Sequence, residues 1–306
     1  MDSPFEYRNC PVCGQNDFEV LFESNMQDYD FREAVETVYM LWGERYGRHV
    51  KCKNCNLIYV NPIRKGSKIN EAYSQRKSFD AAIIKESRLR AAESQVGLVK
   101  KYNDGVRLLD VGCGEGFFLF NASKAGYTAK GIELSQDAAA YARREFGLDV
   151  EAKPLEEMQL PENYFDVVTM WQVLEHVPFP LMILKEVHRV LNQGGVLVIT
   201  TPDIESRLAK VFQRRWWNVR MLHINQFTTK TLTNILKNAG FKNISPVSYK
   251  EYISLLMLFI PILKYLRLYR PLRNLFSLNS GLGKIMNKIV LTYSSTLDNC
   301  TVIGFK

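Results

Sequence analysis

Short apolar runs alternate with helical patterns through the middle of the chain. Four runs have the length of buried strands: Arg107–Val111, Thr128–Ile132, Phe165–Met170 and Gly195–Thr200. Three segments between them are long enough for crossover helices: Gly116–Lys124, Gln136–Phe146 and Leu181–Leu191. Strands that alternate with helices predict a parallel sheet covered by helices on both faces, so we expect an α/β fold.

The segments before and after this middle part show other patterns of apolar and polar residues. Short strands and turns are expected before Pro62, and apolar residues recur at helical spacing in Phe79–Lys101. Thr229–Asn238 is a predicted helix that ends at Gly240, and Phe241–Tyr249 and Thr301–Lys306 are predicted strands. The predicted division is a small N-terminal module, a helical cover, a core, an apolar and basic insertion, and a final core strand: 1–62, 63–103, 104–250, 251–298 and 299–306.

Composition places the chain among folded proteins. Its 306 residues are 46% hydrophobic and 24% charged, which allows a substantial core. Met1–Arg8 contains Asp2 and Glu6 and no apolar run, so we expect no signal peptide and a cytoplasmic location. In that compartment the six cysteines are expected to be metal ligands or buried thiols and not disulfides.

A glycine-rich turn follows the first strand of the core. Leu108–Gly116 reads LLDVGCGEG, and glycine permits close approach of a ligand to the backbone where a helix begins. Glu133 follows the next strand, seventeen residues after Gly116, where a carboxylate can bind the two ribose hydroxyls of a nucleoside. An NAD site shares both features, but its glycine spacing is GxGxxG and here it is GxGxG.

Several motifs, in order, carry a family resemblance: Asp110–Gly116, Glu133, Phe165–Val168, Leu174–Val177 and Leu191–Gly195. Together they resemble the class I methyltransferases that use S-adenosylmethionine, including sugar, glycan and ubiquinone-type enzymes. The resemblance implies a Rossmann-like seven-stranded sheet whose last strand is antiparallel. It also implies that Gly112, Gly114 and Gly116 line the methionine and ribose of the cofactor, with Asp110 fixing the loop and Glu133 binding the ribose.

The remaining cofactor contacts are assigned around these motifs. Cys113 lies inside the glycine loop, and Leu134 directly follows Glu133. Trp171 and Gln172 are expected to shape the methionine end of the pocket. Many relatives have an acidic residue after the third strand that binds the adenine amino group. This chain has Glu151-Ala-Lys-Pro-Leu-Glu156 there, so the backbone at Pro154 and Leu155 is the expected adenine contact.

Two histidines are candidate bases for a hydroxyl acceptor. Methyl transfer is an in-line displacement, and a base with a pKa near the working pH serves a hydroxyl. His176 follows the fourth strand, and His223 lies in an aromatic segment that covers the acceptor site in relatives. The alternatives are that His176 packs against the next helix and that His223 is only hydrogen-bonded within a lid.

Two CxxC pairs predict a zinc site. Cys10 and Cys13 are separated from Cys52 and Cys55 by 38 residues, and two such turns can present four thiolates in a tetrahedron. This zinc-ribbon-like site has no open position, so a structural zinc is expected. Unrelated thiols or a redox pair are the alternatives.

The insertion is unusual in its charge. Val247–Lys306 holds eight Lys or Arg residues against two acidic ones, out of a net charge of +8 for the chain. Tyr252–Leu263 is uncharged but too short to span a bilayer, and a basic residue follows at every third position to Arg273. Residues 252–273 are therefore expected either to contact the inner face of the membrane or to pack on protein, including a second subunit of a homodimer.

These features favour an enzyme that methylates the hydroxyl of a small molecule, such as a sugar or a lipid-linked glycan precursor. A quinone or lipid O-methyltransferase is the close alternative, because the apolar insertion suits it. RNA modification is less favoured, because the basic residues lie among apolar ones and not along a phosphate track. A cofactor-binding protein without activity is the remaining alternative.

Overall fold

A computed structural model describes residues 5–25, 46–65, 71, 73–75, 81–220, 222–265, 268–272, 274–276 and 280–306. Arg267 and Arg273 of the predicted membrane-contact segment lie outside these residues, as does part of the predicted helical cover, 66–70 and 76–80.

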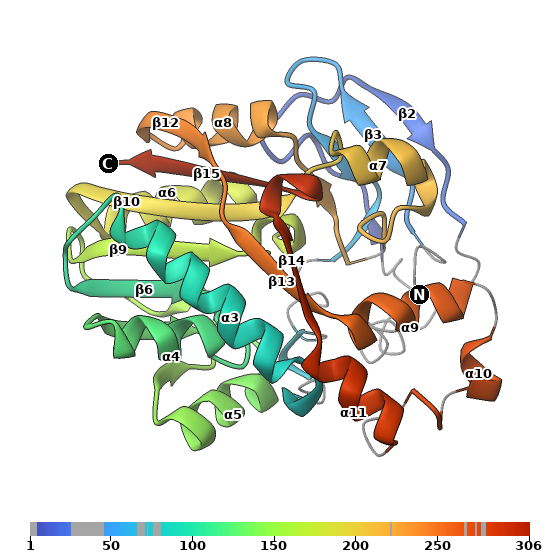
Figure 1. The fold of residues 1–306 in the computed structure, drawn as a ribbon. Coiled ribbons are helices and arrows are strands. Elements are labelled where there is room, and N and C mark those ends of the chain that lie inside the picture. The colour runs from blue at the N-terminus through green and yellow to red at the C-terminus, as the bar shows by residue number, and fades with distance from the viewer. Residues whose placement is uncertain are drawn as a thin grey trace.

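The centre of the protein is a seven-stranded mixed sheet (Figure 1). Its strands are β6 (Arg107–Val111), β7 (Thr128–Ile132), β8 (Asp149–Glu151), β9 (Phe165–Trp171), β10 (Leu191–Pro202), β12 (Lys242–Val247) and β15 (Asn299–Phe305). The order across the sheet is β12-β15-β10-β9-β6-β7-β8. Only β15 is antiparallel to its neighbours β10 and β12 among these described strands. The predicted Rossmann-like sheet with an antiparallel last strand is thus confirmed.

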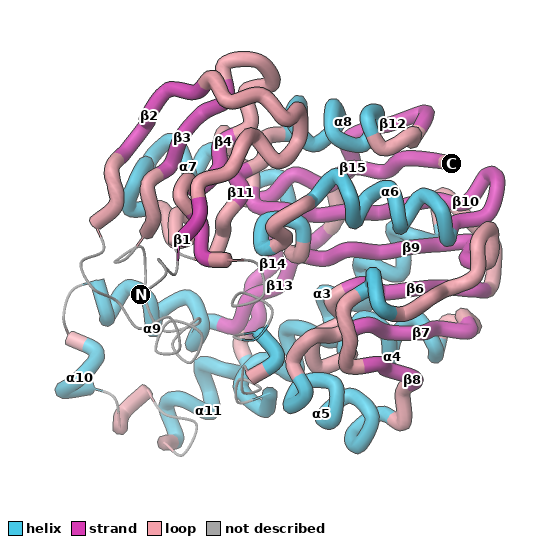
Figure 2. The backbone as a smooth tube through the Cα atoms, turned by 180° about the vertical axis from the view of Figure 1, so that it is seen from behind, coloured by secondary structure: helices cyan, strands magenta, loops and turns pink. Residues whose placement is uncertain are grey.

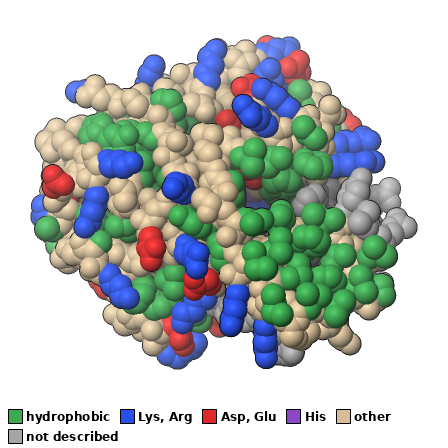
Figure 3. Space-filling model, viewed as in Figure 1, with side chains coloured by type: hydrophobic (Ala, Val, Ile, Leu, Met, Phe, Trp, Pro, Cys, Tyr) green, Lys and Arg blue, Asp and Glu red, His purple; other side chains and the backbone are tan. Residues whose placement is uncertain are grey.

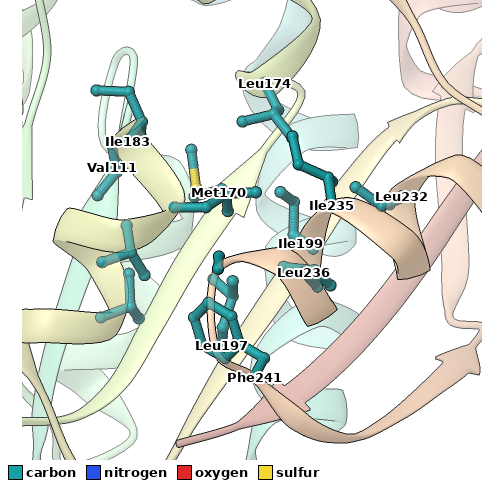
Figure 4. Close-up of a cluster of buried hydrophobic side chains, with 14 of the residues drawn as sticks. Val111, Met170, Leu174, Ile183, Leu197, Ile199, Leu232, Ile235, Leu236 and Phe241 are labelled. Atoms are coloured by element: carbon teal, nitrogen blue, oxygen red, sulfur yellow. The ribbon is translucent and has the colours of Figure 1, made fainter. Parts of the chain in front are cut away.

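Helices cover both faces of this sheet, as the alternation in the strands requires. Leu108 packs with the α3, α4 and α5 side, whereas its neighbour Leu109 packs with α6 and α8. Figure 4 shows Ile183 of α6 and Ile235 of α8 near the sheet residue Met170. The helices are α3 (Ala81–Lys100), α4 (Phe117–Lys124), α5 (Gln136–Phe146), α6 (Pro180–Val190) and α8 (Thr229–Asn238).

The N-terminal module forms a small sheet beside the core. A four-stranded sheet has the order β11-β4-β3-β2, and its member β11 comes from far along the chain (Figure 2). A two-stranded pair, β1 with β5, lies next to it in sequence and extends the module's strand pairing beyond Pro62. The strands are β1 (Phe5–Glu6), β2 (Phe18–Phe22), β3 (His49–Cys52), β4 (Ile58–Val60), β5 (Ile63–Arg64) and β11 (Asn225–Gln226).

The insertion grows out of an antiparallel ribbon that the sequence pattern did not predict. Strands β13 (Lys250–Ser254) and β14 (Val290–Ser294) pair along their whole length. Between them lie α9 (Leu255–Tyr265), α10 (Tyr269–Leu272) and α11 (Gly281–Lys288). Among the helices described, none combines the length and the apolar character that a bilayer span requires.

Short elements complete the described chain. They are α7 (Arg207–Phe212) and the 3₁₀ turns η1 (Leu155–Glu157), η2 (Leu174–His176), η3 (Gln213–Arg215) and η4 (Ser295–Leu297). Two of them, η1 and η2, follow strands β8 and β9 at the carboxyl edge of the sheet, where ligands bind in open α/β folds.

Candidate active site

The glycine turn after β6 requires glycine for two different reasons. Gly112, Gly114 and Gly116 all have positive φ, at 75°, 55° and 81°. A Cβ on Gly112 would overlap the Val173 side chain, and one on Gly116 would lie 2.7 Å from Leu148 Cδ1. A Cβ on Gly114 would meet no atom within 4 Å. The outer two glycines therefore allow close packing, and the middle one leaves open space in front of the loop.

Glu133 is fixed against this loop at the end of β7. Its Oε2 accepts a hydrogen bond from the Gly114 N–H at 2.9 Å, and its Oε1 accepts one from the Ser135 N–H at 2.8 Å. The side chain is buried. Each carboxylate oxygen has a second lone pair, so the pair can still accept the two hydroxyls of a ribose.

Asp110, in the strand that leads into the loop, is bonded to the neighbouring strand β9. Its Oδ1 accepts a hydrogen bond from Thr169 Oγ1 of β9 at 2.7 Å. Burial raises the pKa of this carboxyl to about 8, and the hydrogen bond from Thr169 only partly offsets that rise. Asp110 thus connects the first and fourth strands of the core directly under the glycine turn.

A cavity of about 810 Å³ lies in front of the loop. Ten of the eleven residues predicted to bind the cofactor line it: Asp110, Gly112, Cys113, Gly114, Glu133, Leu134, Pro154, Leu155, Trp171 and Gln172. Gly116 is absent from the wall, because it packs behind the loop against Leu148 and Ala142. The volume suits a ligand of nucleoside size together with a small acceptor.

The ends of β8 and β9 form the two sides of this cavity. Pro154 and Leu155 lie at η1, and Leu155 is buried. Trp171 packs its ring against Phe118, with the centroids 5.2 Å apart. Gln172 has a positive φ of 59° and donates from Nε2 to Asn299 Oδ1 at 2.9 Å, so its side chain is directed by the last strand.

His176 and His223 come together although 47 positions separate them in the sequence. Their rings are edge to face with centroids 4.7 Å apart. His176 lines the cavity, whereas His223 is buried and is not on its wall. His176 Nδ1 lies 2.8 Å from the Leu222 carbonyl oxygen and 2.6 Å from the Tyr73 hydroxyl. Because a carbonyl only accepts, the hydrogen bond to Leu222 places the proton on Nδ1 and leaves Nε2 as the basic nitrogen.

Glu175 is a buried residue beside His176. Its Oε1 is 3.9 Å from His176 Nε2, and neither carboxyl oxygen has a hydrogen-bond partner among the described residues. Burial raises the pKa of Glu175 to about 8. Burial, and then the charge of Arg220, holds the pKa of His223 well below its usual value. His223 therefore stays neutral, and His176 is the histidine of the two that faces the cavity.

Glu175, His176 and His223 also offer three potential metal-ligand atoms within 4.8 Å of one another. Arg220 donates to His223 Nε2 from both its Nε, at 2.9 Å, and a terminal nitrogen, at 2.6 Å. A guanidinium only donates, so the proton of the neutral His223 ring is on Nδ1. One nitrogen of His223 thus accepts from Arg220 and the other carries the proton, so His223 has no lone pair left for a metal ion and the trio is not a ready metal site.

Sequence comparison identifies the family of this chain. Residues 75–245, more than half of the chain, match a family model described as a methyltransferase domain. The chain belongs to this methyltransferase family. A ubiquinone biosynthesis O-methyltransferase of Pseudomonas aeruginosa is 33% identical over 103 residues, which are 32% of this chain and 44% of the relative. The corresponding protein of Methylococcus capsulatus is 37% identical over the same shares of the two chains. The chain thus spans less than half the length of these curated relatives.

A solved structure supports the fold of the methyltransferase domain. A candidate O-methyltransferase of Nostoc punctiforme superposes with a TM-score of 0.50 at 13% identity, covering 74% of this chain and 58% of the other. At that identity the likeness concerns the arrangement of the sheet and helices alone.

The segment Trp216–Phe227, here called the lid segment, contributes Trp217, Asn218 and Arg220 to the cavity wall. The buried carboxylate of Asp298 accepts hydrogen bonds from Trp216 Nε1 at 2.7 Å, Trp217 Nε1 at 3.0 Å and Asn218 Nδ2 at 3.2 Å. Burial raises the pKa of Asp298 to about 6, while the three donors lower it. No local motif identified Asp298, because its partners lie about eighty positions earlier.

The ribbon of the insertion supplies another part of the wall. Tyr249, Glu251 and Tyr293 line the cavity, and the Tyr249 hydroxyl donates to the Glu251 carboxylate. Burial raises the pKa of Glu251. Tyr249 ends a predicted core strand and Glu251 directly precedes the apolar segment, but neither pattern indicated a place on the cavity wall.

The four cysteines of the CxxC pairs meet in one cluster. All four Sγ atoms lie within 4.8 Å of one another, with Cys10–Cys55 at 3.4 Å and Cys13–Cys52 at 3.5 Å. Sulfur atoms about 2.3 Å from a tetrahedral zinc ion are just under 4 Å apart, so the cluster fits zinc. Both turns are tight: the Gly14 N–H donates to the Cys10 carbonyl and the Asn56 N–H to the Cys52 carbonyl, each at 2.9 Å.

The cysteine module is joined to the lid segment. Strand β4 pairs with β11 inside the lid, with Tyr59 opposite Asn225. Arg8, two residues before Cys10, donates to the carbonyl oxygens of Pro178 at 2.8 Å and Ile224 at 3.0 Å. The module therefore holds the chain on both sides of the histidine pair.

Proposed function

We propose that the protein is an S-adenosylmethionine-dependent methyltransferase that acts on the hydroxyl group of a small molecule. The observation that carries this proposal is the position of His176 on the wall of a cavity that also contains the glycine turn and Glu133. An acid that can bind ribose and a histidine that can accept a proton thus share one space of a size that suits cofactor and acceptor together.

The chemistry assigns a task to each side of the cavity. S-adenosylmethionine would supply a methyl group bound to a positively charged sulfur. Gly114 and Glu133 would bind the cofactor, and the backbone at Pro154 and Leu155 would contact adenine. Nε2 of His176 would accept the proton of the acceptor hydroxyl as that oxygen takes the methyl group, and S-adenosylhomocysteine would be the leaving group. Glu175, 3.9 Å from that nitrogen, would stabilise the imidazolium once ionised.

The acceptor side favours a polar group at the reacting end. Asn218, Arg220, Tyr249, Glu251 and Tyr293 all line the cavity there and offer both donors and acceptors. A sugar or a lipid-linked glycan precursor suits such a wall. A quinone or lipid O-methyltransferase is the second candidate, and the similarity to the ubiquinone biosynthesis O-methyltransferases favours it.

The zinc of the cysteine module would be structural in this scheme. All four ligands come from the chain, so no position remains for an acceptor. Its proposed role is to hold residues 1–62 as a unit against the lid segment, through β4 and Arg8. We propose that the rest of the chain divides into the helical cover 63–103, the core 104–250 with strand 299–306, and the insertion 251–298.

The test begins with binding and then asks for turnover. Calorimetry of the purified protein with S-adenosylmethionine and with NAD, repeated on Glu133→Ala, distinguishes the two nucleoside cofactors. We expect S-adenosylmethionine to bind and the variant to bind it at least about tenfold more weakly, since hydrogen bonds to a charged group contribute about 1.5–3 kcal/mol. Glu145→Ala, an exposed change on α5, is the matched control. Binding of NAD alone would refute the proposal.

A second step identifies the acceptor. Release of S-adenosylhomocysteine is followed with nucleotide sugars, polyprenyl-linked sugars and polyprenyl phenols as acceptors. Turnover with either sugar class supports the first candidate, and turnover with the phenols alone supports the second.

A further inference from the structure

The two longer helices of the insertion turn apolar side chains outward. On α9, Leu256 and Leu263 are buried, whereas Leu258, Phe259 and Ile262 are each about 40% exposed. These three fall within about 100° of the helix circumference, which is the width of an ordinary core-facing stripe. Here that stripe faces outward.

Helix α11 extends the same surface. Gly283 and Met286 are buried, while Leu282, Ile285 and Ile289 are exposed, Ile285 by 60%. Since α9 packs against α11, the two stripes adjoin, and Figure 3 shows hydrophobic side chains gathered over both helices. Nine large hydrophobic residues at 258–291 are exposed, of twenty in the whole described chain. So dense an apolar surface indicates a binding partner.

The charge of the insertion identifies that partner. Between Tyr252 and Leu297 the sequence has no acidic residue and six basic ones: Lys264, Arg267, Arg270, Arg273, Lys284 and Lys288. Lys284 and Lys288 are exposed on α11 beside its apolar stripe. An apolar face with cationic residues next to it matches the surface of a bilayer that contains anionic lipids.

A second copy of the chain fits this surface poorly. A symmetric dimer places the same patch of each subunit against the other, so two insertions of like charge would face one another. Their repulsion opposes a dimer, whereas the negative charge of a lipid headgroup favours contact.

We propose that the exposed face of α9 and α11, Leu258, Phe259, Ile262, Leu282, Ile285 and Ile289, docks the protein on an anionic bilayer surface. The helices lie in the headgroup region without crossing it. The ribbon that carries them also supplies Glu251 and Tyr293 to the cavity wall. On the proposed function, the acceptor is therefore a hydroxyl on a molecule held in the membrane by a lipid chain, and it enters the cavity beside this ribbon.

Sedimentation of the full chain with lipid vesicles tests the docking. We expect binding to phosphatidylcholine vesicles that contain phosphatidylglycerol, weaker binding to pure phosphatidylcholine, and loss of the difference at high salt. Ile285→Glu and the double variant Lys284→Glu/Lys288→Glu should each weaken binding at least about tenfold. Met182→Glu on α6 is the matched control, since Met182 is 58% exposed but outside the insertion, and it should bind like wild type.

Two outcomes would overturn the docking. One is a wild-type protein that binds S-adenosylmethionine but no anionic vesicles, or that keeps its vesicle binding with Ile285→Glu. The other is a dimer, seen by light scattering without lipid, that Ile285→Glu dissociates, because the surface would then be a subunit interface. Vesicle binding without S-adenosylmethionine binding would refute the proposed function and leave the docking standing.

Discussion

The main-chain N–H of Gly114 donates a hydrogen bond to Oε2 of Glu133, so the glycine turn and the acid after the next strand form one rigid unit. This contact joins the carboxyl ends of β6 and β7. Because the Cβ position of Gly114 faces open space, the backbone there is accessible to a ligand, whereas a Cβ on Gly112 would overlap the Val173 side chain. The two glycines should therefore respond differently to substitution.

Gly114→Ala should fold and lose cofactor binding. A non-glycine residue in the left-handed region costs about 1–2 kcal/mol, and no atom opposes the new methyl group. The same methyl group would occupy the cofactor space, so we expect S-adenosylmethionine affinity to fall at least about tenfold. Gly112→Ala adds a clash with Val173 and should lose more stability. Thermal unfolding and calorimetry measure the two effects, and equal stability of the variants would contradict this account.

Glu175 should make the fold less stable as the pH rises. Its pKa is about 8 in the folded state against 4.5 for an unperturbed side chain. Between these values the folded state binds a proton that the unfolded chain has released, so the free energy of unfolding falls with increasing pH. Glu175→Gln removes the effect and should stabilise the protein at pH 8 by about 2 kcal/mol or more, with a much smaller gain at pH 5.

Thermal or urea unfolding at the two pH values checks this prediction. Glu157→Gln, an exposed change on η1, serves as the control and should alter neither value. Asp110, whose pKa is also about 8, contributes the same trend to every variant and cancels in the comparison. A gain from Glu175→Gln that is equal at both pH values would show that the carboxyl does not titrate in this range.

Substitutions of His176 and of His223 should differ in their effects on catalysis. His176 faces the cavity with Nε2 as its basic nitrogen, so His176→Gln should lower kcat about a hundredfold or more and leave cofactor affinity unchanged. His223 is behind the wall and bonded to Arg220, so His223→Gln should chiefly lower stability. Single-turnover rates and unfolding curves measure these effects. A larger loss of kcat in His223→Gln would reverse the assignment.

Local signals predicted the core elements well. Helix α8 matches the predicted Thr229–Asn238, because the Thr228 and Thr231 side chains cap its first turn and Gly240 takes a φ of 104° after its end. Strand β10 begins at Leu191 and not at the predicted Gly195, since Leu191 pairs with Phe165 and the ladder then shifts register before Val196.

Contacts between distant segments could not be predicted in the same way. The three side chains bound to Asp298, and the meeting of His176 with His223, depend on how the lid segment returns over the sheet. The β13–β14 ribbon joins strands that the whole insertion separates. Its first strand begins at the charged residues Lys250 and Glu251 and runs on into the apolar segment, so apolar and polar residues do not alternate along it. No local pattern records such pairings, although the two CxxC turns were strong enough to predict their cluster.

Zinc in the cysteine cluster should hold the lid segment in place. The connection runs from Cys10 through Arg8 to the Ile224 carbonyl, and from β4 to β11. Cys52→Ser should therefore remove zinc and speed hydrogen exchange at 224–226, while the amides of β6 and β7 stay protected. Lys53→Ser changes an exposed residue of the same turn whose ion pair with Asp17 contributes little, so it should keep both zinc and protection.

Arg8→Ala tests the connection while all four cysteines remain. Burial lowers the pKa of this guanidinium to about 10, so it is still charged at neutral pH. Its loss removes a donor from the Pro178 carbonyl and from Asn225 Oδ1, while the Ile224 carbonyl keeps the hydrogen bond from the Val60 N–H. Unsatisfied buried groups cost about 1–3 kcal/mol each, so a clear loss of stability is expected with zinc retained. Faster exchange at 224–226 with unchanged zinc content would identify Arg8 as the residue that transmits the order of the module to the lid. Unchanged exchange would mean that strand pairing through β11 is sufficient.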